Sequence, residues 1–324
     1  MSNQVTVVIP NYNGLRFLEE CLASLEKQTY RDFETLVIDN ASSDGSVEFI
    51  RSSFPWVKVA VMKRNLGFSG GVNVGIAMST TPYVLLLNND THSFPGMIEA
   101  LVNAMEESDD IFSASCKMIQ YGDHTKMDDA GDLYTCVGWA FQRGVGQSVA
   151  AYTKPADVFS ACAGAAMYRR EVFNRIGVFD EMHFAYLEDI DLGYRARIAG
   201  YRNVYCPEAK VYHVGSGTSG SKYNSFKVSL SARNSIYLVY KNMPLPQLLL
   251  NLPTLAAGHA VKLAFFKKTG FAGDYLKGLK EGITGCRKCK KVFFEGKNLK
   301  NYVKIQFELW KNTLIYAGDY LARH

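Results

Sequence analysis

The sequence predicts an α/β fold in which helices flank a mostly parallel sheet, and three observations support this prediction. Short β-branched segments alternate with helical patterns through residues 1–120, and polar clusters follow three of the predicted strands. The composition is that of a globular protein, with 48% hydrophobic residues in a chain of 324. Strands separated by helices form parallel sheets that are covered on both faces. A chain of this length accommodates one large α/β domain and a smaller appended region.

The predicted strands are the short apolar runs at 5–10, 33–39, 57–62, 83–88 and 112–118. Between them, helical spacing of apolar residues predicts helices over 15–27, 45–54 and 96–107. Five glycines interrupt the pattern between 121 and 155, which indicates loops and short strands. Order returns at 158–168, and helices are predicted over 170–176 and 187–200. After Tyr240 the composition changes.

Three polar clusters stand where predicted strands end, at 11–14, 39–45 and 88–90. Ligands of parallel α/β sheets bind at the carboxyl ends of the strands, so these clusters are expected to converge on one crevice. Each cluster alone is also explained by turns and helix caps, which favour Asn, Asp, Ser and Gly. Three such clusters together favour a binding site.

A divalent cation site is predicted at Asp90, which follows the buried apolar run 83–87. A carboxylate combined with diphosphate oxygens suits Mg²⁺ or Mn²⁺, and an added imidazole favours Mn²⁺. His213, which follows another short strand, is the candidate imidazole, although a lone histidine is more often structural.

Three carboxylates in four residues, Glu188, Asp189 and Asp191, precede a predicted helix and offer a general base. The alternative is a charged first helical turn that the helix dipole stabilises. At helical spacing Glu188 and Asp191 share a face, whereas Asp189 points elsewhere. Like-charged neighbours would raise the pKa of a carboxylate and make it a better base.

The glycine-rich stretch 65–73 matches neither a phosphate loop nor a dinucleotide-binding fingerprint. Its backbone N–H groups can approach a phosphate or a sugar where the following helix begins. Close packing of that helix on the sheet explains the glycines equally well.

Five ordered motifs across residues 4–240 resemble the family 2 glycosyltransferases of the GT-A fold, in particular their rhamnosyltransferase-like branch. The motifs are VVIPNYNG at 7–14, VIDNASSDGS at 37–46, NLGFSGGVN at 65–73, LLNND at 86–90 and YLEDIDL at 186–192 with Arg195. The resemblance implies an inverting transfer of a sugar from a nucleotide-diphosphate donor, either dTDP-rhamnose or a UDP-sugar. The acceptor would be a hydroxyl group in polysaccharide, cell-wall or glycolipid synthesis.

The resemblance also implies roles for individual residues. Asp189 would be the catalytic base with Glu188 beside it, and Asp90 and His213 would be the metal ligands. Tyr12 would stack on the nucleotide base. The candidate nucleotide-sugar-binding residues are Pro10, Tyr12, Asn13, Asp39, Asn65, Gly67, Asn88 and Asn89.

One position departs from the family pattern, because Asn88 replaces the first carboxylate of its D-x-D motif. The metal site therefore lacks one negative charge, and we expect the ion to arrive together with the nucleotide diphosphate. The segment 159–167 resembles the acceptor side of the family's site, where small residues leave room for a sugar; a tightly packed strand is the alternative.

The predicted division places the catalytic domain at 1–240, with nucleotide-sugar binding over about 1–120 and the acceptor side over about 121–240, and a basic helical region at 241–324. Residues 1–240 carry 21 Lys and Arg against 26 Asp and Glu, whereas 241–324 carry 15 against 5. An uncharged run at 243–261 approaches the length of a membrane span, but its prolines and amides favour an interfacial helical hairpin.

This basic, apolar region is expected to meet an anionic membrane surface or a lipid-linked acceptor rather than nucleic acid. Packing on the catalytic domain and homodimer formation are the competing interpretations. Seven scattered cysteines and an N-terminus without a charged leader favour a cytoplasmic location, peripheral on the inner face of the membrane. Cys286 and Cys289 receive no function, because no second metal-binding pair lies near them.

Two other classes of protein compete with an enzyme of sugar transfer. A non-catalytic nucleotide-sugar or glycan-binding protein on the same scaffold would lack the carboxylates, but Asp90 and Asp189 are present. A nucleotidyltransferase would need a basic phosphate loop near its N-terminus, and residues 11–15 contain none. The sequence therefore favours a glycosyltransferase with a Mn²⁺ or Mg²⁺ cofactor.

Overall fold

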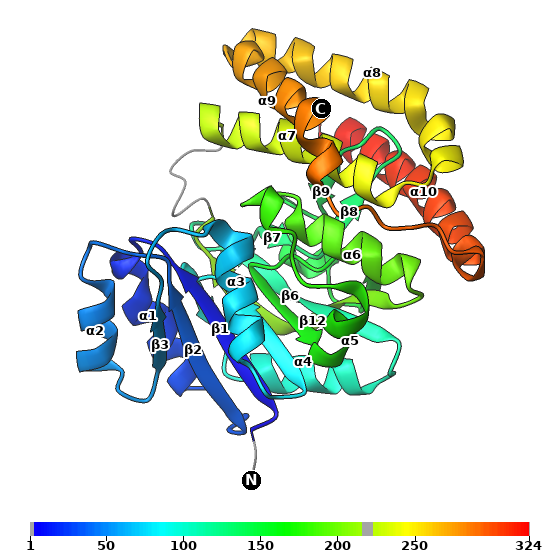
Figure 1. Cartoon of the computed structure of the whole chain (residues 1–324). Coiled ribbons are helices and arrows are strands. Elements are labelled where there is room, and N and C mark those ends of the chain that lie inside the picture. The colour runs from blue at the N-terminus through cyan, green and yellow to red at the C-terminus, as the bar shows by residue number, and fades with distance from the viewer. Residues whose placement is uncertain (1–2, 216–222, 324) are drawn as a thin grey trace.

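The computed structural model describes residues 3–215 and 223–323, which form an α/β body with a layer of helices above one end of its sheet (Figure 1). The predicted fold class, a helix-flanked sheet with a helical C-terminal region, is confirmed. The strands are β1 (Val5–Asn11), β2 (Phe33–Asp39), β3 (Lys58–Val61), β4 (Tyr83–Leu87), β5 (Thr91–Ser93), β6 (Ile111–Gln120), β7 (Met127–Asp129), β8 (Asp132–Tyr134), β9 (Ala140–Gln142), β10 (Ala156–Val158), β11 (Ala165–Arg169) and β12 (Arg202–His213).

The main sheet has the order β10-β12-β6-β11-β4-β1-β2-β3, with β5 paired to β12 and β7 to β6. Strands β1 to β4, β6 and β12 run in one direction, while β11 is inserted antiparallel between β4 and β6. The carboxyl ends of the parallel strands therefore meet at one edge. Asn11, Asp39 and His213 are the last residues of their strands and lie at this edge.

Helices cover both faces of the sheet, as the alternation of strands and helices predicts. They are α1 (Leu15–Glu26), α2 (Ser46–Ser53), α3 (Gly67–Met78), α4 (Met97–Glu106), α5 (Arg170–Ile176) and α6 (Glu188–Ile198). One core unites Leu18, Ile50 and Leu101 with the sheet, so α1, α2 and α4 share one face. The other core contains Val72 and Leu192, which places α3 and α6 on the opposite face.

Four longer helices form the C-terminal layer in Figure 1, namely α7 (Ser225–Asn242), α8 (Leu245–Thr269), α9 (Ala272–Gly285) and α10 (Leu299–Arg323). Small residues let them approach closely. A Cβ atom on Gly278 of α9 would lie 2.1 Å from the carbonyl oxygen of Ser229 in α7, and one on Gly258 of α8 would lie 2.2 Å from that of Val137. The close contact at Gly258 fixes the layer on the hairpin of β8 and β9, and the one at Gly278 holds α9 against α7 within the layer.

Two details of the C-terminal region refine what the sequence predicts. The helical layer begins at Ser225 with α7, before the boundary expected at residue 240. The expected helical hairpin, fringed by Lys262, Lys267 and Lys268, has its turn after Gly270 between α8 and α9, and α8 itself continues as one helix through Pro253. A proline removes one helical hydrogen bond, and a helix of 25 residues that packs along its length tolerates the loss.

Candidate active site

The ends of β1, β2 and β4 are joined by hydrogen bonds between buried polar side chains. Asn11 Nδ2 donates to Asp39 Oδ2 over 3.0 Å, and Asn89 Nδ2 donates to Asn11 Oδ1 over 2.7 Å. Asp39 Oδ1 accepts from the backbone N–H of Ser42 over 2.9 Å. Asp39 Oδ2 therefore ties β2 to the end of β1 and Oδ1 organises the loop after β2, and contact with a ligand would use their remaining lone pairs. The expected convergence of these strand ends is present.

The loop after β1 offers accessible groups beside this buried network. The Tyr12 side chain is 39% exposed, and Pro10 before it is partly buried. Asn13 adopts a φ of 50°, and its Oδ1 accepts from the backbone N–H of Ser43 over 2.9 Å. The Tyr12 ring is thus free to stack on a planar ligand at a rigid turn.

The glycine-rich stretch forms the beginning of α3, as the sequence predicts. The backbone N–H of Gly67 donates to Asn65 Oδ1 over 2.8 Å. Gly67 has a φ of +74°, and a Cβ atom at this position would lie 2.5 Å from the ring of Phe184. Glycine is therefore required here both by backbone conformation and by close packing.

Asp90 and His213 face each other after β4 and at the end of β12. The distance from Asp90 Oδ1 to His213 Nε2 is 3.3 Å, and both side chains are largely buried. Neighbouring ligands of an octahedral ion with bonds of about 2.1 Å lie about 3 Å apart, so this separation fits a shared divalent cation. Asn88 directly follows β4. Its side chain is partly buried and lies beside Gly164.

Asp128 in β7 completes this arrangement from the other side of the imidazole. Its Oδ2 lies 2.7 Å from His213 Nδ1, which leaves Nε2 directed toward Asp90. A carboxylate behind a metal-binding histidine fixes the ring and makes it a stronger ligand. Burial lowers the pKa of His213, but hydrogen bonds to Asp128 and Asp90 outweigh this effect and raise it to about 10. A cation at Nε2 would take the place of the proton.

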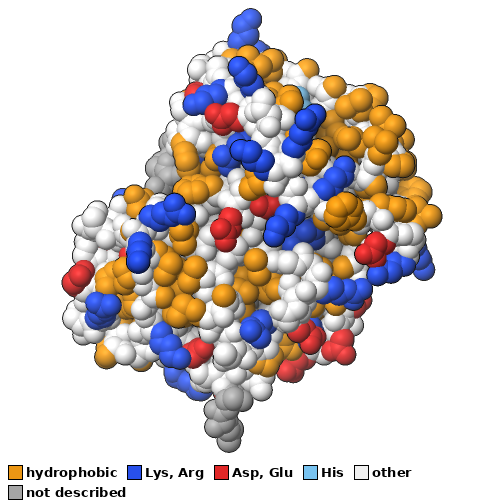
Figure 2. Space-filling model, viewed as in Figure 1, with side chains coloured by type: hydrophobic (Ala, Val, Ile, Leu, Met, Phe, Trp, Pro, Cys, Tyr) orange, Lys and Arg blue, Asp and Glu red, His pale blue; other side chains and the backbone are white. Residues whose placement is uncertain are grey.

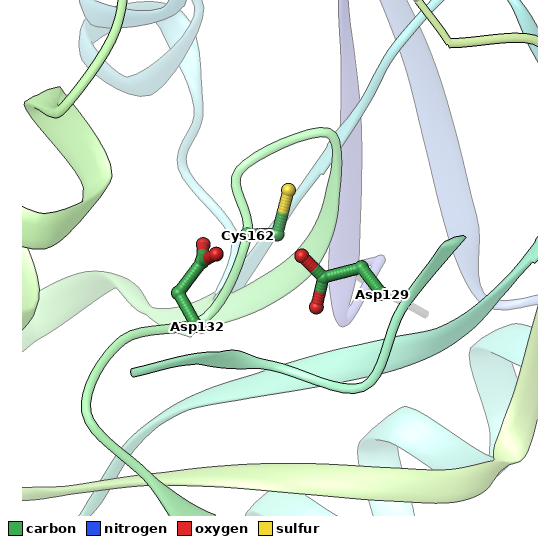
Figure 3. A group of neighbouring side chains, drawn as sticks. All are labelled: Asp129, Asp132 and Cys162. Atoms are coloured by element: carbon green, nitrogen blue, oxygen red, sulfur yellow. The ribbon is translucent and has the colours of Figure 1, made fainter. Parts of the chain in front are cut away.

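A second group of acidic side chains lies directly beside the first. Figure 3 shows the carboxyl groups of Asp129 and Asp132 facing each other beside the thiol of Cys162, and their nearest ligand atoms lie within 4.8 Å of one another. Burial, together with the charge of Asp128, raises the pKa of Asp129 to about 7. Burial and the neighbouring carboxylates also raise the pKa of Asp132 well above its usual value. Burial and mutual repulsion therefore favour the protonated form of these carboxyl groups.

Asp189 is in contact with this acidic group at the first turn of α6. Its side chain makes a hydrogen bond with Asp132, and burial raises its pKa above the ordinary value. Its backbone carbonyl accepts from Ser160 Oγ over 2.6 Å, which holds the helix start in place. Glu188 is also buried, and burial followed by repulsion from Asp189 raises its pKa well above the usual value. A carboxyl group with a raised pKa is suited to proton transfer near neutral pH.

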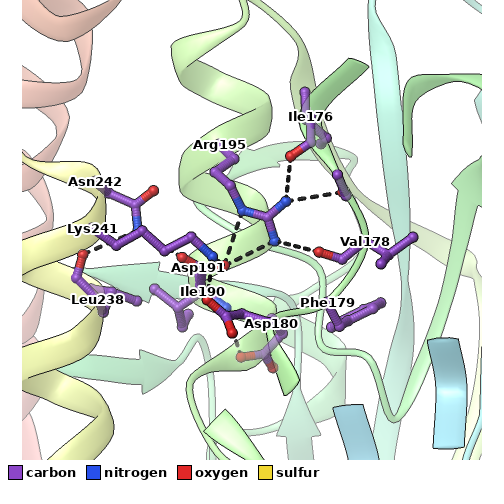
Figure 4. A network of polar contacts seen from close by, with 12 residues as sticks. Ile176, Val178, Phe179, Asp180, Ile190, Asp191, Arg195, Leu238, Lys241 and Asn242 are labelled. Carbon is purple, nitrogen blue, oxygen red and sulfur yellow. Dashed lines mark hydrogen bonds and ion pairs between the residues drawn. The ribbon is translucent and has the colours of Figure 1, made fainter. Parts of the chain in front are cut away.

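Asp191 faces a different environment and is a structural residue. Figure 4 shows it surrounded by the cationic and amide groups of Arg195, Lys241 and Asn242. Arg195 Nε, Lys241 Nζ and Asn242 Nδ2 reach it over 3.0, 2.9 and 2.8 Å. Although burial raises the pKa of Asp191, the charges of Arg195 and Lys241, together with His183 and the Asn242 hydrogen bond, outweigh it and lower the pKa well below the usual range. Asp191 therefore joins α6 to α7.

Asp128, Asp129 and Asp132 were not predicted from the sequence as site residues. They lie in the segment 121–155, where β7 and β8 are three residues long and too short for a periodic signal. The sequence does contain a signal for them, namely the acidic pair Asp128 and Asp129 followed by a third carboxylate at Asp132. Their pairing with β6 and β9 brings them to His213 and Asp189.

Comparison with protein families and curated relatives gives a consistent result. The family described as Glycosyl transferase family 2 matches residues 6–177. An N-acetylglucosaminyl-diphospho-decaprenol L-rhamnosyltransferase of Mycobacterium tuberculosis is 28% identical over 250 residues, which cover 68% of this chain and 79% of that protein.

Solved structures with similar folds include two sugar-transfer enzymes. GalNAc-T7 with UDP, GalNAc and Mn²⁺ aligns with a TM-score of 0.60 and 18% identity, over 74% of this chain and 48% of that one. This chain thus spans about half the length of that protein. The mannosyltransferase PcManGT of Pyrobaculum calidifontis, in complex with GDP-Man and Mn²⁺, aligns with a TM-score of 0.52 and 16% identity, over 89% and 88% of the two chains. The likeness to both is one of fold.

Proposed function

The chain belongs to glycosyl transferase family 2, and on that premise we propose that it is an inverting enzyme that moves a sugar from a nucleoside diphosphate to an acceptor hydroxyl. The observation that carries this proposal is one continuous set of side chains at the carboxyl edge of the sheet. A candidate cation site, Asp90 with His213, stands beside a candidate base, Asp189, and Asp128 and Asp132 link the two.

Asp90 and His213 would hold a Mn²⁺ or Mg²⁺ ion, which when bound neutralises the charge of the departing diphosphate. Asn88 adds no charge at this position, so the diphosphate oxygens would supply the missing ligands. Two observations support an ion at this position. Asp90 Oδ1 and His213 Nε2 lie 3.3 Å apart, and Asp128 orients the His213 ring so that Nε2 is directed toward Asp90.

Asp189 would accept the proton of the acceptor hydroxyl while that oxygen attacks the anomeric carbon from the face opposite the diphosphate. A single displacement of this kind inverts the anomeric configuration. Buried Glu188 would lie beside the acceptor, and burial together with the charge of Asp189 raises its own pKa. A base whose pKa approaches the working pH accelerates such a step by about 10²- to 10⁴-fold.

The nucleotide would lie along the loops after β1 and β2. Tyr12 would stack on the base, and Pro10, Asn13 and Asp39 would shape the pocket for base and ribose. The beginning of α3 would lie beside the diphosphate and sugar, with Asn65 Oδ1 holding the turn at Gly67 in shape by accepting its backbone N–H. Asn89 holds the first of these loops against the end of β4.

We propose dTDP-rhamnose as the first donor to test and a lipid-linked sugar diphosphate as the first acceptor, ahead of UDP-sugars and soluble glycans. The M. tuberculosis relative supports this choice by its name, which specifies an L-rhamnosyltransferase and a decaprenol-linked acceptor. Its identity of 28% leaves the donor pocket free to differ, so the UDP-sugars stay in the panel.

The proposal predicts that one nucleotide sugar is turned over in a panel of dTDP-rhamnose, UDP-glucose, UDP-N-acetylglucosamine and GDP-mannose with Mn²⁺. The measurement is release of the nucleoside diphosphate by chromatography, with and without polyprenyl-diphospho-N-acetylglucosamine as acceptor. We expect the acceptor to accelerate release of one nucleotide only. Binding of a donor in calorimetry without any turnover would instead support the non-catalytic binding protein.

A further inference from the structure

The C-terminal layer exposes an unusual amount of apolar surface. Most of the large hydrophobic side chains that are exposed in the described chain lie after Met243. Phe293 is 84% exposed, Leu314 75%, and Leu245 and Phe307 63% each. Figure 2 shows apolar side chains gathered at the upper right of the molecule, where Figure 1 places α8. Large contiguous patches of this kind mark interaction sites.

An apolar groove of about 570 Å³ lies within this surface, between the beginning of α8 and α10. Its apolar lining includes Leu250, Phe294, Val303, Phe307 and Trp310. The groove is open to the surface, and aromatic side chains such as Phe293 and Trp310 line it. It is therefore suited to flexible hydrocarbon chains rather than to a polar ligand.

The chemistry of α10 matches that of a helix lying in a lipid interface. Leu299, Val303, Phe307, Trp310 and Leu314 recur at helical spacing and are all exposed. The exposed lysines Lys300, Lys304 and Lys311 stand beside them on the same helix. An apolar stripe edged by lysines is typical of helices that rest on anionic membranes.

Helix α8 is long and apolar enough to cross a membrane, and only 17% of its apolar stretch is buried in the described structure. Its polar side chains, however, fix it along the protein. Gln306 of α10 bonds with both Gln247 and Asn251 over 2.8–3.1 Å, and His259 Nδ1 lies 2.7 Å from the hydroxyl of Tyr275. These contacts fix one side of α8 on the protein, so only its exposed side is available to a membrane.

From these observations we infer that α8, α10 and the segment 291–294 form a docking surface for an anionic phospholipid bilayer, with acyl chains entering the groove. Charge complementarity supports this partner, because residues 241–324 carry 15 Lys and Arg against 5 Asp and Glu. Lys291 lies at the groove itself. Each lysine near an anionic surface strengthens binding by about fivefold. The inference does not depend on the proposed sugar transfer, since it concerns binding alone.

The test is co-sedimentation of the full chain with vesicles of phosphatidylcholine alone or mixed with phosphatidylglycerol. We expect the protein to pellet with the mixed vesicles and to bind pure phosphatidylcholine at least about tenfold more weakly. The variant Phe307→Ser/Trp310→Ser should lose binding by a similar factor, and Lys300→Glu/Lys304→Glu should bind only weakly. Thermal melting checks that each variant is folded.

Val61→Ser/Met78→Ser is the matched control, because these side chains are 48% and 51% exposed and lie on the α/β body. It should bind vesicles like the wild type. Wild-type protein that stays in the supernatant with mixed vesicles would overturn the proposal, as would full binding by the Phe307→Ser/Trp310→Ser variant. If light scattering finds a dimer that this variant disrupts, and vesicles do not bind, the surface is an interface with a second copy.

Discussion

Replacing Asp189 by Asn should reduce turnover of the donor by about 10²- to 10⁴-fold, because the base that accepts the acceptor proton is lost. The carboxylate and the amide have nearly the same size, so the start of α6 should keep its structure. Donor affinity, measured by calorimetry with Mn²⁺, should stay unchanged, since the role proposed for Asp189 is toward the acceptor and not the donor. The loss should therefore appear in kcat and not in binding of the donor.

The pH profile gives a second readout of the same residue. Burial raises the pKa of Asp189, and the base must be deprotonated to act, so kcat should rise with pH through a value above the ordinary 3.8. This rise of kcat with pH should disappear in Asp189→Asn. Asp109→Asn is the matched control, because the Asp109 side chain is fully exposed on the surface and should leave kcat unchanged. Wild-type turnover in Asp189→Asn would remove this residue as the base.

Replacing Asp90 by Ala should abolish the dependence of turnover on Mn²⁺ and reduce kcat by at least about 100-fold. Stabilisation of the leaving diphosphate by a bound ion contributes several kcal/mol to the transition state, and about 1.4 kcal/mol corresponds to each tenfold change. Calorimetry should also detect Mn²⁺ binding to the wild type only when a nucleoside diphosphate is present. Because Asn88 stands where the family has a carboxylate, the site lacks one negative charge, and Mn²⁺ should bind only together with the nucleoside diphosphate.

The substitution Asp128→Asn tests the residue that orients the proposed metal ligand His213. His213 would keep its place in β12 but lose the carboxylate that fixes its ring at 2.7 Å. We expect Mn²⁺ affinity in the presence of nucleotide to fall by about 10- to 100-fold, less than in Asp90→Ala. Tight binding of Mn²⁺ to the nucleotide-free wild type would contradict this account of the site.

The α/β body was predictable because its signals are local. The strand and helix that surround Asn11, and those that surround Asp39, are defined by periodic patterns a few residues long, and the polar residues at their ends mark the edge of the sheet. The position of β11 was not predictable, because an antiparallel strand between two parallel ones depends on pairing between distant segments. Asp90 and Asp189 were therefore foreseen as candidates, but their spatial relation was not.

The acidic residues of β7 and β8 show the limit of this reasoning most clearly. Asp128 and Asp132 have no periodic neighbours, and only folding places one behind His213 and the other against Asp189. The path of α8 was missed for a related reason. The prolines and amides of the run 243–261 argue against one long helix, whereas α8 is continuous and contacts the protein through Gln247, Asn251 and Gly258.

The most direct test of the central claim is the anomeric configuration of the product that the wild-type chain forms from its donor. Proton NMR spectroscopy of the transferred sugar reports this configuration against that of the nucleotide sugar. A single displacement assisted by Asp189 predicts a product with the configuration inverted. A product that retains the donor configuration would contradict the role of Asp189 as the base and the geometry proposed for this site.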